Sequence, residues 1–467
     1  MWERYGFYVI QSLLALFLTL QLDLSNSKTY SIVGTFTALS YIMPILGGYI
    51  SDQLLGQKMA VIFGCVTLFI SYFYLSFFFN SPTTLAISLG GIAIGTGLLK
   101  PNIACLVGNL YESGDSRRDG GFSIYYAGMA LGILIGTTIP ILLKHAYGWQ
   151  LTFFTPGIAL VVALFIFLFG IKKFKIKNSN PISLNLPKLV NAAFLSIIAW
   201  VSAFILLDYP FAAFLFFLII AIGSVFIVTG IAMKEKKVQR AKTFSFLILC
   251  FISVLFWMLY FQLFLSLTLF IYHCLKTHLW GLHMHPTYYI AIESLGLVLF
   301  GPLLSPVFSK FALRQDAIDA SVKFILSIFF LVIAFLLVIL SIIFTHKTAL
   351  ISPLWIIFAY LSVSFAELLL SPVGLSMSTK LVRPQVVGLM MGIFFVSLGV
   401  GGYLAGLLAQ LSSVPKNTSY IEMKSIYLTA FSYYFYIALG ILALTIILCL
   451  LIRKINLSAV ASASFDT

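Results

Sequence analysis

The sequence predicts an all-α protein that crosses a membrane many times. Of its 467 residues, 61% are hydrophobic and only 9% are charged, and the mean hydropathy is +1.07. An ordinary soluble domain has about 25% charged residues. The apolar residues form runs of about 20, which is the length that a helix needs to cross the hydrocarbon of a bilayer. These runs follow one another almost from end to end of the chain.

Polar residues, prolines and glycines divide this apolar sequence into predicted spans. We expect fourteen membrane-spanning helices, over residues 2–22, 31–51, 59–79, 84–107, 122–144, 149–171, 188–207, 211–233, 244–273, 286–308, 324–345, 350–375, 386–411 and 426–452.

The basic residues are concentrated in alternate breaks between the spans. If the N-terminus is cytoplasmic, the inner loops contain most of them, including the clusters at 172–177 and 234–242. The outer loops then carry only Lys28, Lys144, Lys276, Lys347, Lys416 and Lys424. Because cytoplasmic loops are enriched in Lys and Arg, both termini are predicted to be cytoplasmic. The formal net charge of +14 is therefore attributed to loop anchors and not to nucleic-acid binding.

The order of spans and basic loops predicts two lobes. Removing the seventh and eighth spans leaves six plus six, which is the count of a two-lobed transporter built from repeats. We predict an N-terminal six-helix lobe at 1–171, a linker with two extra transmembrane helices at 172–243, and a C-terminal six-helix lobe at 244–467.

Apart from Lys144 and Lys188 at the very ends of their spans, the charged residues inside predicted spans are Glu3, Arg4, Lys100, Glu293 and Glu367. A charge near the centre of a spanning helix costs roughly 2.5–3.5 kcal/mol on insertion scales, so such residues usually face an internal, watered path. A set with both signs predicts that a charged solute or protons cross the membrane here. The alternative for each residue is a structural role, in which it bonds neighbouring helices together.

Motifs for other chemistry are missing from the sequence. The five cysteines are scattered without CxxC spacing, and there is no nucleophile elbow, metal-ligand box or phosphate-binding GxxxxGK[ST]. We therefore expect no enzyme activity and no cofactor. Four histidines of the predicted outer side could bind a metal or sense pH, namely His273, His278, His283 and His285. Ordinary loop histidines are favoured, because no carboxylate or cysteine lies nearby to complete a site.

Several motifs resemble those of one family, the proton-dependent oligopeptide transporters of the major facilitator superfamily. WERYGFY (2–8) resembles the end of ExxERFxYY, and GGYISDQLLG (47–56) resembles GGxxADxxxG. GTGLLKPN (95–102) resembles the family's lysine-bearing fourth helix. FSIYYAGMALG (122–132) resembles FYxxINxG, and FAELLLSPVGLS (365–376) resembles ELxxSPxGLS. The likeness covers essentially the whole chain, including the two extra spans that are typical of bacterial members.

The resemblance implies a major facilitator fold and a symporter that imports di- and tripeptides with protons by alternating access. It implies that Lys100 and Arg4 hold the peptide carboxylate and Glu367 its amino group. The full set of implied substrate-binding residues is Arg4, Tyr8, Tyr41, Lys100, Gln262, Glu293, Glu367 and Ser371. The implied proton-coupling residues are Glu3, Arg4, Lys100, Glu293 and Glu367. A location in the bacterial inner (cytoplasmic) membrane is implied as well, with the lipid bilayer, peptides and protons as partners. We expect a monomer.

The chain also departs from the family's pattern. The first glutamate of ExxER would fall immediately before Met1; an upstream start is favoured, and loss of a coupling acid is the alternative. Glu293 stands where the family usually has asparagine, and Phe261 stands where many relatives have an acid. One interpretation is that the acid has moved from the seventh canonical helix to the eighth. Met129 and Ala130 replace the polar position of INxG.

These departures leave two alternatives open. The same fold could carry another small solute, such as an amino-acid conjugate or an organic anion, with altered or lost proton coupling. A transport-dead receptor or sensor is the second alternative. For Tyr8, Tyr41 and Gln262, packing inside the helix bundle competes with a substrate contact.

Overall fold

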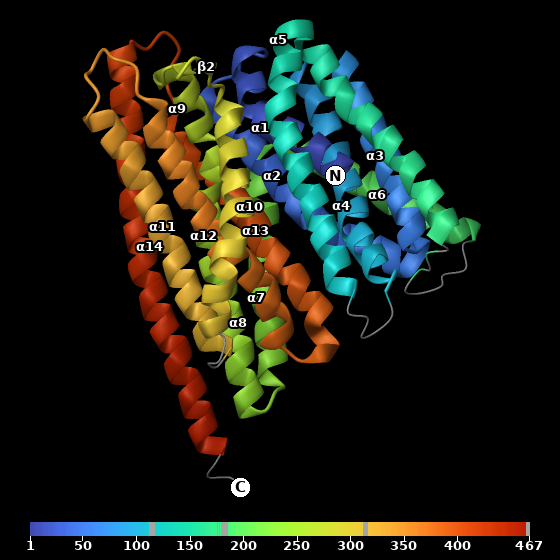
Figure 1. Ribbon diagram of the computed structural model, residues 1–467. Helices are drawn as coiled ribbons and strands as arrows, with labels where there is room; N and C mark the ends of the chain where they lie inside the picture. The colour runs from blue at the N-terminus through green and yellow to red at the C-terminus, as the bar shows by residue number, and fades with distance from the viewer. Residues whose placement is uncertain (112–116, 175, 177, 179–184, 312–315, 464–467) are drawn as a thin grey trace. The chain divides into compact units, whose positions relative to one another are not determined.

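Helices make up almost all of the structure (Figure 1). The computed structural model describes residues 1–111, 117–174, 176, 178, 185–311 and 316–463. Positions 175 and 177 of the predicted basic loop and 179–184 of the predicted linker lie outside the described residues.

The chain forms two compact units. Unit 1 consists of Met1–Leu24 and Ser31–Ala213, and unit 2 of Ser25–Tyr30 and Phe214–Thr467. The predicted lobe boundaries at residues 171 and 243 stay a prediction. Unit 1 contains α1 (Trp2–Leu20), most of α2 (Asn26–Ile50), the π-helix η1 (Ser51–Leu55), α3 (Gln57–Phe77), α4 (Pro82–Gly108), α5 (Arg117–Phe174) and α6 (Leu186–Asp208).

Unit 2 begins within α7 and runs to the end of the chain. Its helices are α7 (Pro210–Met233), α8 (Lys237–Tyr260), η2 (Phe261–Phe264), α9 (Ser266–Cys274), α10 (Pro286–Phe311), α11 (Asp316–Ile343), α12 (Pro353–Lys380), η3 (Pro384–Val386), α13 (Val387–Ala409), η4 (Gln410–Ser412) and α14 (Tyr420–Ala463). A hairpin of β1 (His278–Leu279) and β2 (Leu282–His283) joins α9 to α10.

All fourteen predicted spans coincide with helical segments. The fifth and sixth spans are the two parts of α5, which breaks at Gly148 with φ 81°, a conformation that favours glycine. The ninth span is α8, η2 and α9 in succession. Among the described residues, eleven helical segments are long and apolar enough to cross a membrane, with α5 counted once. The predicted first and tenth spans, α1 and α10, are not among these eleven. The prediction of an all-α polytopic membrane protein is thus confirmed.

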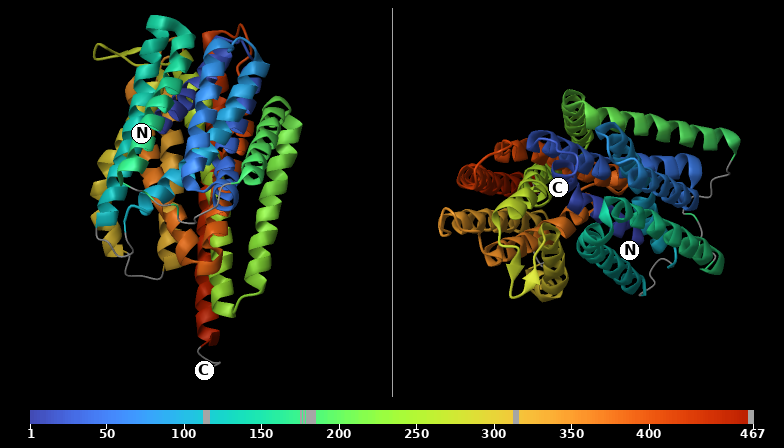
Figure 2. Two further views of the ribbon diagram at one scale, coloured as in Figure 1. Left: turned by 90° about the vertical axis from the view of Figure 1, so that its right-hand side faces the viewer. Right: turned by 90° about the horizontal axis from the view of Figure 1, so that it is seen from above.

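The two extra spans, α6 and α7, belong to different units. Two further views again show a structure that is almost wholly helical (Figure 2). In unit 1, the indole Nε1 of Trp200 on α6 donates to the carbonyl of Ile87 on α4 at 2.7 Å. In unit 2, Phe217 on α7 stacks on Tyr403 of α13, with ring centroids 4.7 Å apart. Each extra helix is therefore attached through its own unit's side chains.

Glycines bring the charged helices of unit 1 close together. A Cβ on Gly97 of α4 would lie 2.7 Å from the main chain of Met43 on α2. A Cβ on Gly132 or Gly136 of α5 would lie 2.4 Å from Met1 O or 2.7 Å from Tyr5 O. Small residues let helix backbones approach in this way. These crossings place α1, α2 and α4 so that their polar side chains can gather.

Two adjacent glycines of α2 provide a matched test of this packing. A Cβ on Gly47 would lie 2.1 Å from the carbonyl oxygen of Gly97, whereas a Cβ on Gly48 would meet nothing within 4 Å. Overpacking a tight contact costs about 1–3 kcal/mol. We expect Gly47→Ala to lower the Tm of the purified protein and Gly48→Ala to leave it unchanged. Equal Tm values for the two variants would contradict the close α2–α4 crossing.

Candidate functional site

The first turn of α1 carries an ion pair between neighbouring residues. The Nε of Arg4 donates to Glu3 Oε2 at 2.6 Å, and a terminal guanidinium nitrogen contacts Glu3 Oε1, so the pair is bidentate. The two side chains are only 8% and 11% exposed. The guanidinium carbon also lies 4.8 Å from the ring centroid of Phe7. A planar guanidinium is suited to this arrangement, because it can bond a carboxylate with two parallel N–H groups.

Lys100 lies close enough to this ion pair to interact with it electrostatically. Its Nζ is 4.9 Å from the ring centroid of Tyr41 on α2, and its charge acts on both Glu3 and Arg4. The hydroxyls of Tyr8 and Tyr41 in turn interact with Arg4. The structure therefore brings five predicted site residues together in unit 1. We call Glu3, Arg4, Tyr8, Tyr41 and Lys100 the unit-1 cluster.

The charge balance of the unit-1 cluster suits an anion. With both cations and the carboxylate ionised, it carries one net positive charge inside an apolar bundle. An anionic group could satisfy that charge with short, charge-assisted hydrogen bonds. Protonation of Glu3 would release Arg4 from its partner and raise the net charge of the cluster from +1 to +2, so the cluster can also respond to protons.

A second polar cluster lies in unit 2, where Tyr260 of α8 meets two glutamates. The hydroxyl of Tyr260 donates to Glu367 Oε2 on α12 at 2.6 Å and lies 3.5 Å from Glu293 Oε1 on α10. The two carboxyl groups hydrogen-bond each other. We call Tyr260, Glu293 and Glu367 the unit-2 cluster. It contains two predicted residues and one that sequence analysis missed.

Tyr260 had a detectable signal in the sequence. It directly precedes Phe261, the position where many relatives carry an acid, and a tyrosine inside a span brings a polar hydroxyl that needs a partner when buried. Tyr260 is not among the candidate site residues predicted from the sequence. Its hydroxyl is what connects α8 to both carboxyl groups.

Gln262 is engaged in bonds within unit 2. Its side-chain amide donates to the main-chain carbonyls of Ala405 at 3.0 Å and Met258 at 3.3 Å, and its oxygen accepts from the Ser266 hydroxyl at 2.7 Å. The residue is fully buried. These bonds hold the break between α8 and α9 against α13. They favour the packing alternative for Gln262, and its role in substrate binding stays a prediction.

Ser371 lies one turn beyond Glu367 on α12, on the same helix face and half-buried.

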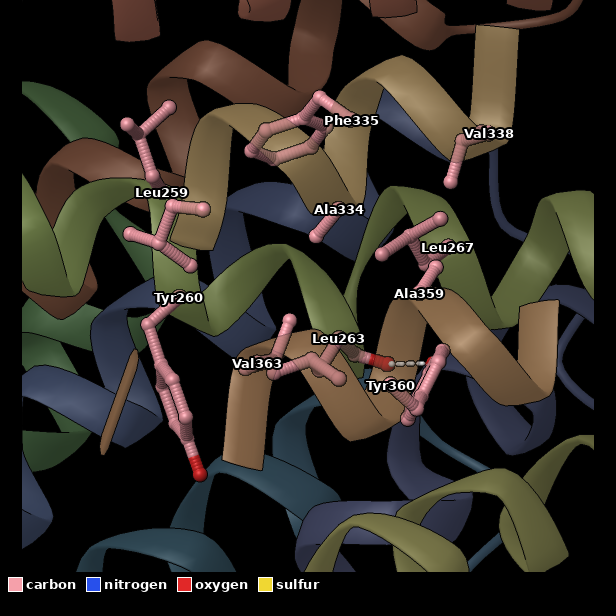
Figure 3. Close-up of a pocket in the computed structure, with 11 residues that line it drawn as sticks. Leu259, Tyr260, Leu263, Leu267, Ala334, Phe335, Val338, Ala359, Tyr360 and Val363 are labelled. Atoms are coloured by element: carbon pink, nitrogen blue, oxygen red, sulfur yellow. Dashed lines mark hydrogen bonds between the residues drawn. The ribbon is translucent and has the colours of Figure 1, made fainter. Parts of the chain in front are cut away.

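A small cavity lies next to Tyr260 (Figure 3), where Tyr360 donates to the carbonyl of Leu263 at 3.3 Å. Its volume is about 10 Å³ and its lining is mostly aliphatic. That is scarcely room for one water molecule, so this cavity is not a substrate site.

The outer histidines do not form a metal centre in the part of the chain that the structure describes. His278 and His283 face each other across the β1–β2 hairpin, with ring centroids 5.0 Å apart. No group of three or more His, Cys, Asp or Glu side chains among the described residues could hold a metal ion. His273 lies on α9 and not in a loop, so the loop interpretation is wrong for this residue.

Comparison with known proteins places the chain in a family. The sequence profile of the POT family matches residues 57–427. The chain belongs to the POT family. The resemblance seen in the motifs is thereby confirmed, and because POT proteins are transporters, so is the expectation that this chain is not an enzyme.

Curated relatives of this POT protein are similar at 29% identity. One is the dipeptide and tripeptide permease B of Yersinia enterocolitica, matched over 72% of this chain and 69% of the relative. Another is the dipeptide and tripeptide permease B of Salmonella typhimurium, matched over 98% of this chain and 93% of the relative.

Solved structures share the fold along nearly the whole length. A bacterial homologue of the human drug peptide transporters PepT1 and PepT2 is 24% identical, with a TM-score of 0.83 over 97% of this chain and 96% of the homologue. The tetrameric PepTSo2 is 24% identical, with a TM-score of 0.82 over 97% and 96%. The fold is therefore that of the POT transporters of the major facilitator superfamily.

The bonds of Gln262 generate a prediction about stability. In Gln262→Ala the buried carbonyl of Ala405 and the hydroxyl of Ser266 lose their partner, which costs about 1–3 kcal/mol for each group left unsatisfied. We expect a clearly lower Tm for the ligand-free protein, measured in detergent, whereas the control variant Ser371→Ala keeps the wild-type Tm. If Gln262 serves only to contact substrate, the ligand-free Tm of Gln262→Ala will equal that of the wild type.

Proposed function

We propose that this protein is a proton-coupled symporter that imports di- and tripeptides by alternating access. The observation that carries the proposal is the gathering of Glu3, Arg4 and Lys100 in the apolar interior of unit 1. The relatives that are named dipeptide and tripeptide permease B support this substrate class. Each proton moved inward adds about 2.3 kcal/mol of electrical driving force per 100 mV.

The proposal assigns one end of the peptide to each cluster. A short peptide is a zwitterion, so its carboxylate suits Arg4 and Lys100, and its ammonium suits Glu367. The hydroxyls of Tyr8 and Tyr41 would bond the peptide main chain. Gln262, Glu293 and Ser371 complete the proposed contacts in unit 2.

Proton coupling in unit 1 is assigned to the Glu3–Arg4 pair. A buried carboxylate beside an arginine can exchange that partner for a proton, and neither state leaves a naked charge. Protonated Glu3 would free Arg4 to bind the peptide carboxylate together with Lys100. Loss of the proton would return Arg4 to Glu3 and weaken the binding of the peptide carboxylate.

The membrane orientation that we propose for the transporter follows from the charge of its loops. We propose a multi-pass protein of the inner (cytoplasmic) membrane with both termini in the cytoplasm. A single chain carries both clusters, so we propose that a monomer is the functional unit. No cofactor enters the proposed cycle.

Uptake of dialanine into proteoliposomes under an inward proton gradient tests this proposal. The proposal predicts accumulation that a protonophore abolishes. Equilibration without accumulation would reject coupling, and binding without entry would make the protein a receptor.

A transporter of a different solute is the second candidate, because Glu293 replaces the family's asparagine. Competition assays that compare dipeptides with single amino acids and organic anions separate the two candidates. Complete indifference of the protein to dipeptides would favour the second.

Lys100 provides the most direct mutational prediction. Lys100→Ala removes a charge-assisted hydrogen bond to the peptide carboxylate, and such bonds contribute about 1.5–3 kcal/mol. We expect dialanine uptake at low concentration to fall roughly 10- to 150-fold at equal protein level. The exposed Lys28→Ala serves as the control and keeps wild-type uptake. Normal uptake by Lys100→Ala would contradict the assignment of the carboxylate.

A further inference from the structure

The connection between α7 and α8 concentrates positive charge at one end of unit 2. Residues 234–242, which we call the α7–α8 basic segment, contain five cations and a single acid, Glu235. The cations are Lys234, Lys236, Lys237, Arg240 and Lys242. We propose that this segment binds the headgroup of an anionic phospholipid whose acyl chains lie along α7. The inference goes beyond the proposed function, and its test measures lipid binding and not transport.

The single acid of the segment does not neutralise these cations, because it is already paired inside the protein. The side chain of Glu235 is 0% exposed. It accepts a hydrogen bond from Arg383 Nε at 2.8 Å and another from the Thr243 hydroxyl at 2.5 Å. Glu235 and Arg383 therefore neutralise each other, and the segment keeps the positive charge of its own cations. All four of its lysines are exposed.

Hydrogen bonds hold the α7–α8 basic segment in one position on unit 2. The side-chain amide of Gln239 donates to the carbonyl of Leu381 at 3.0 Å. A terminal guanidinium nitrogen of Arg240 donates to the carbonyls of Met233 and Glu235, both at 3.2 Å. These bonds add to the ion pair of the buried acid. Cations on a main chain that is already fixed lose less conformational entropy when they bind an anion.

The start of α8 places cations where a helix favours anions. The helix begins at Lys237, its N-cap residue is Lys236, the side chain of that residue makes no capping bond, and the first turn contains no acid. Main-chain N–H groups at the start of a helix carry partial positive charge, so lysines there are unfavourable and anions are stabilised. A bound phosphate group would relieve this repulsion. Local conflicts of this kind are typical of functional sites.

α7 provides an apolar surface that ends at the α7–α8 basic segment. The helix contains no charged residue, and little of it is buried. Ile222, Phe226 and Met233 lie on one of its faces, and all three side chains are exposed. A helix of this composition faces lipid chains when it crosses a bilayer. Because Met233 directly precedes Lys234, a phospholipid on this face has its headgroup beside the lysines.

The combination of fixed cations and a lipid-facing helix selects the class of ligand. Clusters of four to eight Lys and Arg residues at the end of a spanning helix bind anionic lipid headgroups. Phosphate oxygens accept charge-assisted hydrogen bonds from several such donors at once. A free phosphate ion would contact only the cations, whereas a phospholipid also covers the apolar face of α7. In the orientation proposed above, this lipid lies in the cytoplasmic leaflet.

Native mass spectrometry of the purified full-length protein in detergent tests the proposal. The probe is phosphatidylglycerol, and phosphatidylcholine with the same acyl chains is the lipid without net charge. We expect one tightly bound phosphatidylglycerol and roughly tenfold or weaker binding of phosphatidylcholine. Inorganic phosphate at the same concentration should not displace the lipid. Equal binding of the two lipids, or displacement by phosphate, would overturn the proposal.

Two pairs of adjacent lysines give matched variants. The double variant Lys236→Gln/Lys237→Gln removes two exposed charges from the α7–α8 basic segment, and Lys172→Gln/Lys173→Gln removes two exposed charges from the end of α5. We expect the first to weaken phosphatidylglycerol binding roughly 30-fold. The second should leave the binding unchanged. Equal losses in the two variants would mean that net charge alone attracts the lipid, and wild-type binding by the first would contradict the site itself.

Glu235→Gln distinguishes a fixed site from a loose positive surface. The substitution raises the net charge by one, so simple attraction predicts tighter binding of phosphatidylglycerol. In the proposed site, loss of the ion pair with Arg383 loosens the segment, and we expect the affinity to fall about threefold or more. A Tm measurement on each variant shows that it is folded. Unchanged or tighter binding by folded Glu235→Gln would show that the fixed position of the segment is not what binds the lipid.

Discussion

The cost of burying charge inside a membrane protein is the constraint on which both clusters depend. In unit 1, Glu3 and Arg4 neutralise each other through a bidentate contact, and Lys100 lies over the ring face of Tyr41. In unit 2 the hydroxyl of Tyr260 donates to Glu367 at 2.6 Å and lies 3.5 Å from Glu293. Such buried charges can exchange partners, because another charged group or a proton can neutralise each of them at a similar free energy.

Backbone packing is what gives the side chains these positions. Gly97, Gly132 and Gly136 allow helices to touch at their main chains, so that polar residues on α1, α2 and α4 meet. In unit 2 the helix breaks between α8 and α9, and Gln262 bonds the interrupted main chain to α13. Irregular backbone within a membrane protein needs partners of this kind inside the protein. The positions of the site residues therefore depend on close helix crossings and on one helix break whose main chain is hydrogen-bonded within the protein.

The sequence predicted site residues best where a charged residue stands in an otherwise apolar span. The spans follow from apolar length, and Lys100, Glu293 and Glu367 stand out because charges are rare in spans. The break in α5 at Gly148 also fell between two predicted helices. Tyr260 was missed because a tyrosine in an aromatic run looks like packing, and its partners are 33 and 107 residues away. Gln262 was predicted to contact substrate. The sequence does not show which main-chain carbonyls a broken helix leaves unpaired, so its bonds inside the protein could not be predicted.

The central claim is that these buried charges exist to complement the two ends of a peptide. The most direct measurement compares the binding of dialanine, its C-terminal amide and its N-acetyl derivative to wild type, Lys100→Ala and Glu367→Gln. The account predicts that amidation weakens binding to wild type but has little further effect on Lys100→Ala, and that acetylation behaves likewise with Glu367→Gln. Equal losses for each derivative on all three proteins would contradict the account, because the charges would then recognise something else.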